Sequence, residues 1–104
     1  MTDKALSMIG LASKAGKIVS GEFSVTSAVR KKKAFLVVVA KDASENTRKT
    51  FRDMCSYHHV PIRFYGTIEG LGTFTGKGVR ASLAVMDAGF AATIEKLIDQ
   101  EITL

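Results

Sequence analysis

The amino-acid sequence predicts an α/β fold, a three-layer α/β/α sandwich with a small mixed sheet. Segments with helical periodicity alternate with short apolar segments, an order typical of helices packed on a central sheet. The segment Phe35–Ala40 is a continuous apolar run, which indicates a strand covered by helices on both faces. The length of 104 residues suits one domain, so we expect residues 1–104 to form a single unit.

Capping residues and glycines delimit the elements of the first half. Asp3 can cap a first helix, because short polar side chains favour helix starts, and Gly16 can end it. Gly21 then opens a second helix, whose buried stripe we expect to be Val25, Ala28 and Val29. In order, the expected elements are a helix over 4–15, an extended segment over 18–19, a helix over 21–32 and the strand over 35–40.

The second half repeats the alternation. Ser44 can cap a third helix, in which Phe51, Cys55 and His58 follow one stripe at helical spacing. Thr67 can cap a short helix in the same way. After the third helix we expect a strand over 62–65, a short helix over 67–74, a strand over 80–86 and a last helix that begins at Asp87 or Gly89.

Basic residues outnumber acidic ones and are unevenly distributed. Fifteen Lys and Arg against ten Asp and Glu give a net charge of +5. Residues 1–86 carry fourteen basic and six acidic side chains, whereas residues 87–104 carry one basic and four acidic side chains. Clustered basic charge favours a polyanionic partner. The alternative, a basic surface that only keeps the chain soluble, stays open at this point.

Cysteine usage and hydropathy indicate the compartment. Cys55 is the only cysteine, so the chain can form no intramolecular disulfide. The first residues contain no long apolar run, so we expect neither a signal peptide nor a membrane span. Together these features predict a cytoplasmic protein without a membrane partner.

A glycine-rich segment has some likeness to a phosphate-binding loop. Gly70, Gly72, Gly76 and Lys77 have the wrong spacing for either common phosphate-loop motif. Gly78 also stands where such a loop needs Ser or Thr for magnesium. We therefore interpret these glycines as residues that permit tight turns and close packing.

Other candidates for catalysis or metal binding are weak. His58 and His59 would point about 100° apart on a helix and could not share a metal ion. Cys55 lies in the same apolar stripe as His58, which predicts a buried, inert thiol. Asp42 and Asp87 each precede a helix, and capping explains each one singly. We expect no enzyme, no metal, no cofactor and no small-molecule substrate.

The second predicted helix carries features of a phosphate-binding surface. Its start at Gly21 presents unpaired backbone N–H groups, which can hold a phosphate. Ser24, Ser27 and Lys31 share one helical face. Phe23 can either stack on an unpaired base or cover the core as a hydrophobic staple. Further basic residues that could contact phosphates are Lys14, Lys17 and the run 30–33.

Four segments in a fixed order point to one family. They are Gly21 with residues 34–43, then Val60-Pro61, then residues 71–77, then residues 83–87. This combination resembles the kink-turn-binding ribosomal proteins of the L7Ae and L30e type, in particular their small bacterial members. The resemblance spans about residues 4–98. It implies an α/β/α sandwich that binds structured RNA without catalysis.

The resemblance also implies which residues meet the RNA, because members of that family hold it with two loops. At the first loop Gly21 is kept, whereas Phe23, Ser24 and Ser27 stand where Asn, Glu and Lys commonly hydrogen-bond sheared G·A pairs. The second loop corresponds to Thr67–Gly70, with an apolar tip that would touch a flipped-out base. The candidate RNA-binding residues are Lys14, Lys17, Gly21, Glu22, Phe23, Ser24, Ser27, Lys31, Thr67, Ile68, Glu69 and Gly70.

We therefore predict a non-enzymatic protein that binds structured RNA, either ribosomal or another kinked RNA. Because the Asn, Glu and Lys of the first loop are absent, we expect weaker discrimination in favour of kink-turns than the family usually shows. The alternative is a protein-interaction module whose basic face binds an acidic partner. A small enzyme ranks third, because the sequence offers no catalytic set.

Overall fold

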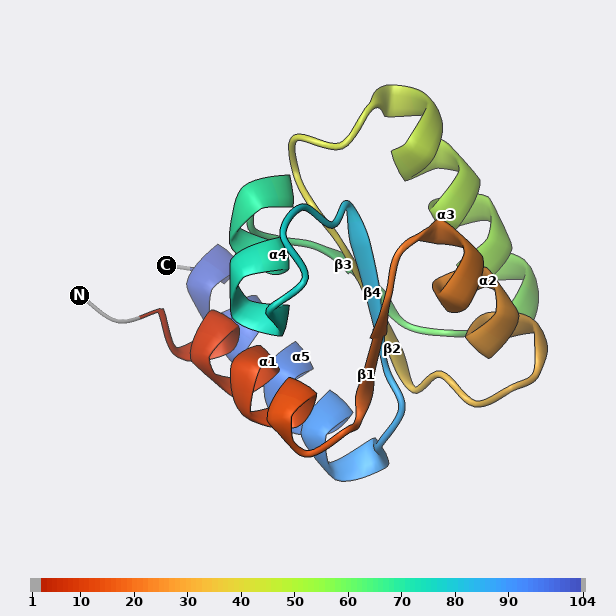
Figure 1. Cartoon of the computed structure of the whole chain (residues 1–104). Coiled ribbons are helices and arrows are strands. Elements are labelled where there is room, and N and C mark those ends of the chain that lie inside the picture. The colour runs from red at the N-terminus through yellow and green to blue at the C-terminus, as the bar shows by residue number, and fades with distance from the viewer. Residues whose placement is uncertain (1–2, 104) are drawn as a thin grey trace.

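The structure is a computed structural model that describes residues 3–103, the last two of them by backbone only. Within this range five helices alternate with four strands, as the periodicity predicts (Figure 1). In chain order the elements are α1 (Lys4–Lys14), β1 (Ile18–Ser20), α2 (Glu22–Arg30), β2 (Leu36–Val39), α3 (Glu45–His58), β3 (Ile62–Phe64), α4 (Ile68–Thr75), β4 (Ser82–Val85) and α5 (Ala88–Thr103).

The strands of the described chain form one mixed sheet in the order β1-β4-β2-β3, which confirms the small mixed sheet. β4 is antiparallel to β1 and β2, whereas β2 and β3 are parallel. Because of these directions, β1, β2 and β3 all end at the side where β4 begins. We call this side the Gly21 end, after the residue that follows β1. We call the other side the lysine end, after Lys14, Lys17, Lys31, Lys32 and Lys33.

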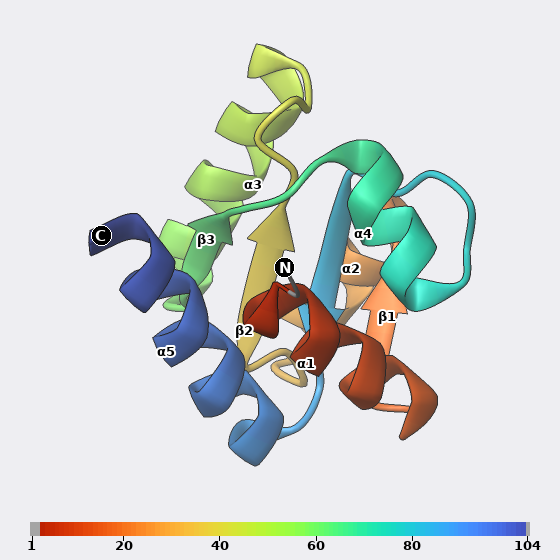
Figure 2. The ribbon, with the colours of Figure 1, turned by 90° about the vertical axis from the view of Figure 1, so that its left-hand side faces the viewer.

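Helices cover both faces of the sheet, which confirms the three-layer sandwich. α2 and α3 lie on one face, and α1, α4 and α5 lie on the other (Figure 1). Figure 2 looks onto the face with α1, α4 and α5, and α2 lies behind the strands. On this face α1 contacts both α4 and α5, and on the other α2 contacts α3.

The core lies where the strands meet the helices. Every residue of β2 and β4 is buried, and so is the predicted stripe Val25, Ala28 and Val29 of α2. Phe35, predicted as part of the strand, instead precedes β2 and is 48% exposed. The register explains this difference, because Leu36 forms the outermost pair of β2 with β4 at the lysine end.

Helix α2 ends two residues earlier than predicted. The N–H of Lys31 still donates to the carbonyl of Ser27, but Lys32 has a left-handed backbone with φ 59°. A residue in this conformation stops a helix. Lys31, Lys32 and Lys33 therefore lie in the turn between α2 and β2.

Side chains cap four of the five described helices. One sequence interpretation is wrong, since Asp42 lies three residues before the first residue of α3 and does not cap that helix. Its carboxylate instead accepts a hydrogen bond from the N–H of Ile68 at 2.8 Å, at the start of α4. The capping residues are Asp3 for α1, Ser44 for α3, Thr67 for α4 and Asp87 for α5.

The glycine-rich segment packs closely, as predicted. Gly72 lies inside α4, and a Cβ atom on it would stand 1.6 Å from the carbonyl oxygen of Gly78. Only a residue without a side chain lets the backbones of α4 and of the following loop approach so closely. This contact fixes the loop that leads from α4 into β4.

The remaining candidates for chemistry are structural. Cys55 is fully buried, as predicted, and burial raises the pKa of its thiol to about 11. His58 is half-buried, and its ring meets the ring of Tyr57 edge-on, with 4.9 Å between the centroids. Within residues 3–103 no group of three or more His, Cys, Asp and Glu side chains could hold a metal ion. None of the helices in this range combines the length and the apolar character that crossing a membrane requires.

Candidate nucleic-acid interface

The topology divides the predicted RNA-binding residues between the two ends of the sheet. The segment 21–24 follows β1 and the segment 67–70 follows β3, so both predicted loops lie at the Gly21 end. Ser27 lies midway along α2. The structure thus brings the two loops together, but it places three predicted residues at the opposite, lysine end: Lys14, Lys17 and Lys31.

The N-terminus of α2 exposes backbone donors at the Gly21 end. Gly21 has φ 91°, a conformation that favours glycine, and its own N–H donates to the carbonyl of Ser82. No described side chain caps the first turn of α2, unlike the other helices. The first intrahelical bond runs from Val25 to Gly21, so the N–H groups of residues 22–24 lack an intrahelical acceptor. A helix start of this kind attracts anions.

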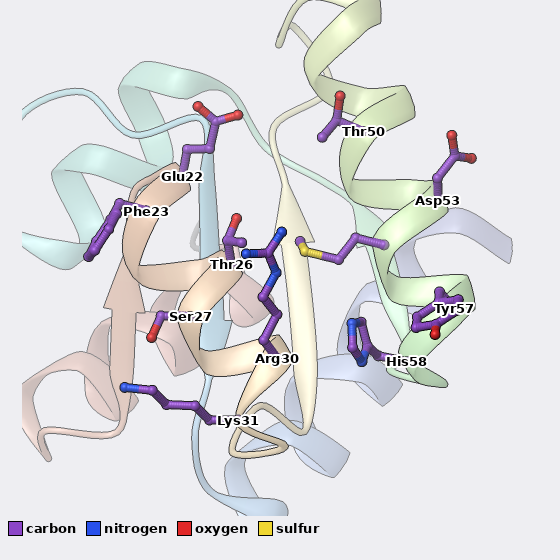
Figure 3. Close-up of a pocket in the computed structure, with 11 residues that line it drawn as sticks. Glu22, Phe23, Thr26, Ser27, Arg30, Lys31, Thr50, Asp53, Tyr57 and His58 are labelled. Carbon is purple, nitrogen blue, oxygen red and sulfur yellow. The ribbon is translucent and has the colours of Figure 1, made fainter.

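The exposed surface of α2 has two flanks. Phe23, Ser27 and Lys31 lie along the flank away from α3, whereas Glu22 lies on the other flank (Figure 3). Phe23 is 87% exposed, so the staple interpretation is wrong and its ring is free to contact a partner. The buried stripe of α2 already covers the core, and Phe23 lies off that stripe.

Hydroxyl and cationic side chains surround a cavity of about 330 Å³ beside the start of α2, which we call the hydroxyl cavity. Arg80 donates from Nε to Ser20 Oγ at 3.1 Å and from Nη1 to the carbonyl of Val79 at 2.8 Å. No carboxylate belongs to the described lining, which favours an anionic ligand. The lining residues are Ser13, Ile18, Val19, Ser20, Ser24, Thr75, Lys77 and Arg80.

Arg80 is not among the RNA-binding residues predicted from the sequence, and it was predicted to begin a strand. The structure places Arg80 in the loop between α4 and β4, where its N–H donates to the carbonyl of Ile68 at 3.2 Å. Its Cδ atom lies 3.9 Å from the position that a Cβ on Gly21 would occupy. Arg80 therefore joins the two predicted loops. A basic residue directly after the glycine-rich segment was the available signal, but its position beside Gly21 depends on strand register.

The second predicted loop offers fewer free groups than expected. Thr67 Oγ1 accepts from the N–H of Gly70 at 2.9 Å, and Asp42 occupies the N–H of Ile68. This helix start is therefore already occupied by acceptors, and Glu69 beside them is exposed. Ile68 packs against the core and is only partly accessible, so part of its side chain stays open for the predicted apolar contact. Val79, in the loop between α4 and β4, is a more exposed apolar residue near this helix start, at 65%.

A larger groove of about 1110 Å³ lies between α2 and α3. Arg30 of α2 and His58 of α3 lie on the facing sides of the two helices (Figure 3). Both carboxylates and cations line this groove, namely Glu22 and Asp53 together with Arg30 and Lys31. The mixed charge makes the groove a poorer match for a polyanion than the hydroxyl cavity.

The comparison with known sequences identifies the family that the sequence resembles. The family described as "Ribosomal protein L7Ae/L30e/S12e/Gadd45 family" matches residues 3–95. The RNA-binding protein YlxQ of Bacillus subtilis (strain 168) is 41% identical over 92 residues, which cover 88% of this chain and 92% of that protein. The RNA-binding protein YlxQ of Enterococcus faecium is 40% identical over 96 residues, which cover 92% of each chain.

Two solved structures share the fold. A protein described as of unknown function from Bacillus halodurans C superposes with a TM-score of 0.91 at 36% identity, covering 94% of this chain and 99% of that one. The Giardia lamblia 15.5kD RNA binding protein superposes with a TM-score of 0.75 at 18% identity, covering 91% and 82% of the two chains. At that identity the second likeness shows the fold alone.

Proposed function

Because the chain belongs to the Ribosomal protein L7Ae/L30e/S12e/Gadd45 family, we propose that it binds structured RNA through the Gly21 end of its sheet. Two relatives that are about 40% identical over nearly their whole length carry the name RNA-binding protein. The expectation that the chain is not an enzyme is confirmed, since this family is non-enzymatic. We also propose that residues 1–104 act as one RNA-binding domain in the cytoplasm, without a cofactor.

One observation carries the proposal: a helix start without a described side-chain cap opens beside a cavity whose described lining holds no carboxylate. The N–H groups of α2, the hydroxyls of Ser20 and Ser24, and the cation of Arg80 lie at this end, and Lys77 lines the same cavity. Backbone phosphates accept hydrogen bonds from such groups, and these contacts fix how a protein sits on a nucleic acid. The net charge of +5 adds a long-range attraction of the same sign.

The RNA that fits this surface is a kinked one, ribosomal or otherwise, read with less base specificity than is usual. Phe23, Ser24 and Ser27 are accessible at positions where the resembling proteins commonly use Asn, Glu and Lys. A good polar base contact is worth about 1–3 kcal/mol of discrimination in DNA readout. Losing several such contacts should reduce the preference for intact G·A pairs by orders of magnitude, while the phosphate contacts remain.

Filter binding tests this proposal with three RNAs of equal length: a kink-turn, the same RNA with its G·A pairs disrupted, and an unstructured strand. We expect the two structured RNAs to bind more tightly than the unstructured strand. Arg80→Gln should weaken both structured complexes by at least about tenfold, since a hydrogen bond to a charged group is worth about 1.5–3 kcal/mol. Lys96→Gln on α5 removes the same charge and should change neither. Equal affinity for all three RNAs would contradict the proposal.

The groove between α2 and α3 favours a second candidate function, the docking of a protein. Tyr57 on its rim is 80% exposed, and large exposed aromatic side chains are enriched at protein interfaces. A pull-down from lysate with and without nuclease separates the candidates. A partner protein that survives nuclease treatment and is lost in Tyr57→Ala would favour the groove over RNA binding.

A further inference from the structure

The lysine end of the sheet carries five lysines, none of which belongs to the described lining of the hydroxyl cavity. Lys14 and Lys17 flank the turn between α1 and β1, and the other three lie in the turn between α2 and β2. All five are exposed. None of them takes part in the ion pairs of the described residues, which join Lys49 to Asp53 and Arg63 to Glu95 and Asp99.

Strand register brings the two lysine turns to the same side. Ile18 of β1 and Leu36 of β2 both pair with Val85 of β4, so the two turns leave the sheet at the same level. The N–H of Met86 donates to the carbonyl of Lys17 at 2.7 Å, which fixes the first turn against β4. Two strand spacings separate the turns, about 10 Å. The lysines therefore form one basic surface from two segments far apart in sequence.

The shape of the second turn holds its lysines outward. The N–H groups of Lys31, Lys32 and Lys33 donate to carbonyls of the last turn of α2, and Lys32 takes the left-handed conformation. One or two cations would suffice to offset the dipole at a helix C-terminus, so helix stability does not account for all of them. Asp87, the acidic residue closest in sequence to this end of β4, is engaged in capping α5.

We propose that the lysine end binds the backbone phosphates of a duplex stem that extends from the RNA bound at the Gly21 end. This inference rests on the proposed function and adds a second, separate contact to it. The flank of α2 that carries Phe23, Ser27 and Lys31 joins the two ends (Figure 3). Ten residues separate Gly21 from Lys31, so at ~1.5 Å per residue the ends lie about 15 Å apart. At roughly 2.8 Å per base pair of an A-form RNA duplex this is about five base pairs.

The proposal makes affinity depend on stem length. A stem shorter than about five base pairs ends before it reaches the lysines, whereas a longer stem places phosphates beside them. Each phosphate contact makes the slope of log K against log salt steeper by about 0.9. One contact therefore raises the binding constant about eightfold when the salt concentration falls from 1 M to 0.1 M. Affinity at 0.1 M salt should therefore rise in one step, about eightfold or more, and then stay constant.

The experiment uses kink-turn RNAs whose two stems are lengthened in turn by single base pairs, measured by filter binding at several salt concentrations. The lysine variant is Lys32→Gln, Lys33→Gln. A control with the same loss of charge is Lys4→Gln, Lys96→Gln, because these two lysines are also exposed but lie outside the lysine end. Thermal unfolding checks that both variants fold, and Gln at position 32 faces the same backbone strain as Lys.

The expected result is that the wild type and the control show the step for one stem, and that the lysine variant loses it while keeping its affinity for the shortest RNA. A wild type that binds all stem lengths equally would overturn this inference and leave the proposed function intact. A lysine variant that weakens short and long RNAs to the same extent as the control would also overturn it, because the lysines would then act only through net charge. If no kink-turn RNA binds at any length, the proposed function itself fails.

Discussion

Truncating Phe23 separates a role in RNA stacking from a role in folding. The ring is 87% exposed, so only the small remainder of its surface stabilises the folded state. A Phe side chain buries roughly 200 Å² when it is fully covered, and the covered part here is about 25 Å². At ~25 cal/mol per Å², Phe23→Ala should lower the free energy of unfolding by about 0.6 kcal/mol. For a domain of this size the melting temperature should fall by no more than about 5 °C.

The effect of the same substitution on RNA affinity should be larger. Stacking of one base on an aromatic ring is worth about 1–3 kcal/mol, which is roughly 5- to 150-fold in Kd. Tyr57→Ala is the matched control, because Tyr57 is also an aromatic residue, is 80% exposed, and lies on α3 away from the Gly21 end. Circular dichroism melts and filter binding to one kink-turn RNA measure the two quantities on the same samples.

Two outcomes would contradict this reasoning. A loss of more than about 2 kcal/mol of stability would mean that Phe23 is covered in solution, since fully buried Phe residues cost about 3–5 kcal/mol when truncated. Unchanged affinity in a well-folded Phe23→Ala variant would show that the exposed ring does not touch the RNA. A loss of affinity in Tyr57→Ala of the same size would mean that the contact is not specific to the start of α2, since both rings line the groove between α2 and α3.

Three further predictions concern stability. Gly72→Ala should lower the free energy of unfolding in urea by at least about 3 kcal/mol, because its Cβ would collide with the backbone of Gly78. Gly10→Ala in α1 is the control and should lower it little, because the nearest atom to its Cβ would be 3.4 Å away. Cys55 should resist thiol reagents at pH 8 in the native state. Its pKa is raised to about 11 in the folded protein, so its contribution to the free energy of unfolding is fully present below the pKa of the unfolded chain and is lost as the pH rises from about 9 towards 11. Burial and a hydrogen bond to the carboxylate of Asp3 raise the pKa of Tyr65 above its usual value, so the free energy of unfolding should fall further above about pH 10. Denaturant titrations across pH test this, and Tyr65→Phe should remove that fall.

Local sequence patterns were sufficient for the fold. Asp3, Ser44 and Thr67 begin helices where their side chains predict, because a cap acts within three residues of the chain. The apolar run before Lys41 is buried on both faces, because only a central strand can accommodate such a run. These signals require no knowledge of distant contacts.

The candidate site was harder to predict, because its parts meet only through strand register. Lys17 and Gly21 lie close in sequence, yet β1 separates them by its full length and assigns them to opposite ends of the sheet. Asp42 serves a helix start that lies 26 positions further along the chain. Arg80 reaches Gly21 only because β1 and β4 are neighbours. None of these placements leaves a periodic trace in the sequence.

The exposed flank of α2 has a consequence for how such a protein can change over time. Phe23, Ser24 and Ser27 contribute nothing to the buried stripe of the helix, so substitutions there cost little folding energy. A lineage can therefore exchange hydrogen-bonding side chains for a stacking ring one residue at a time, and every intermediate still folds. The fixed turn at Gly21 keeps presenting the same backbone donors throughout. RNA preference in this scaffold is thus free to drift while the architecture is held constant.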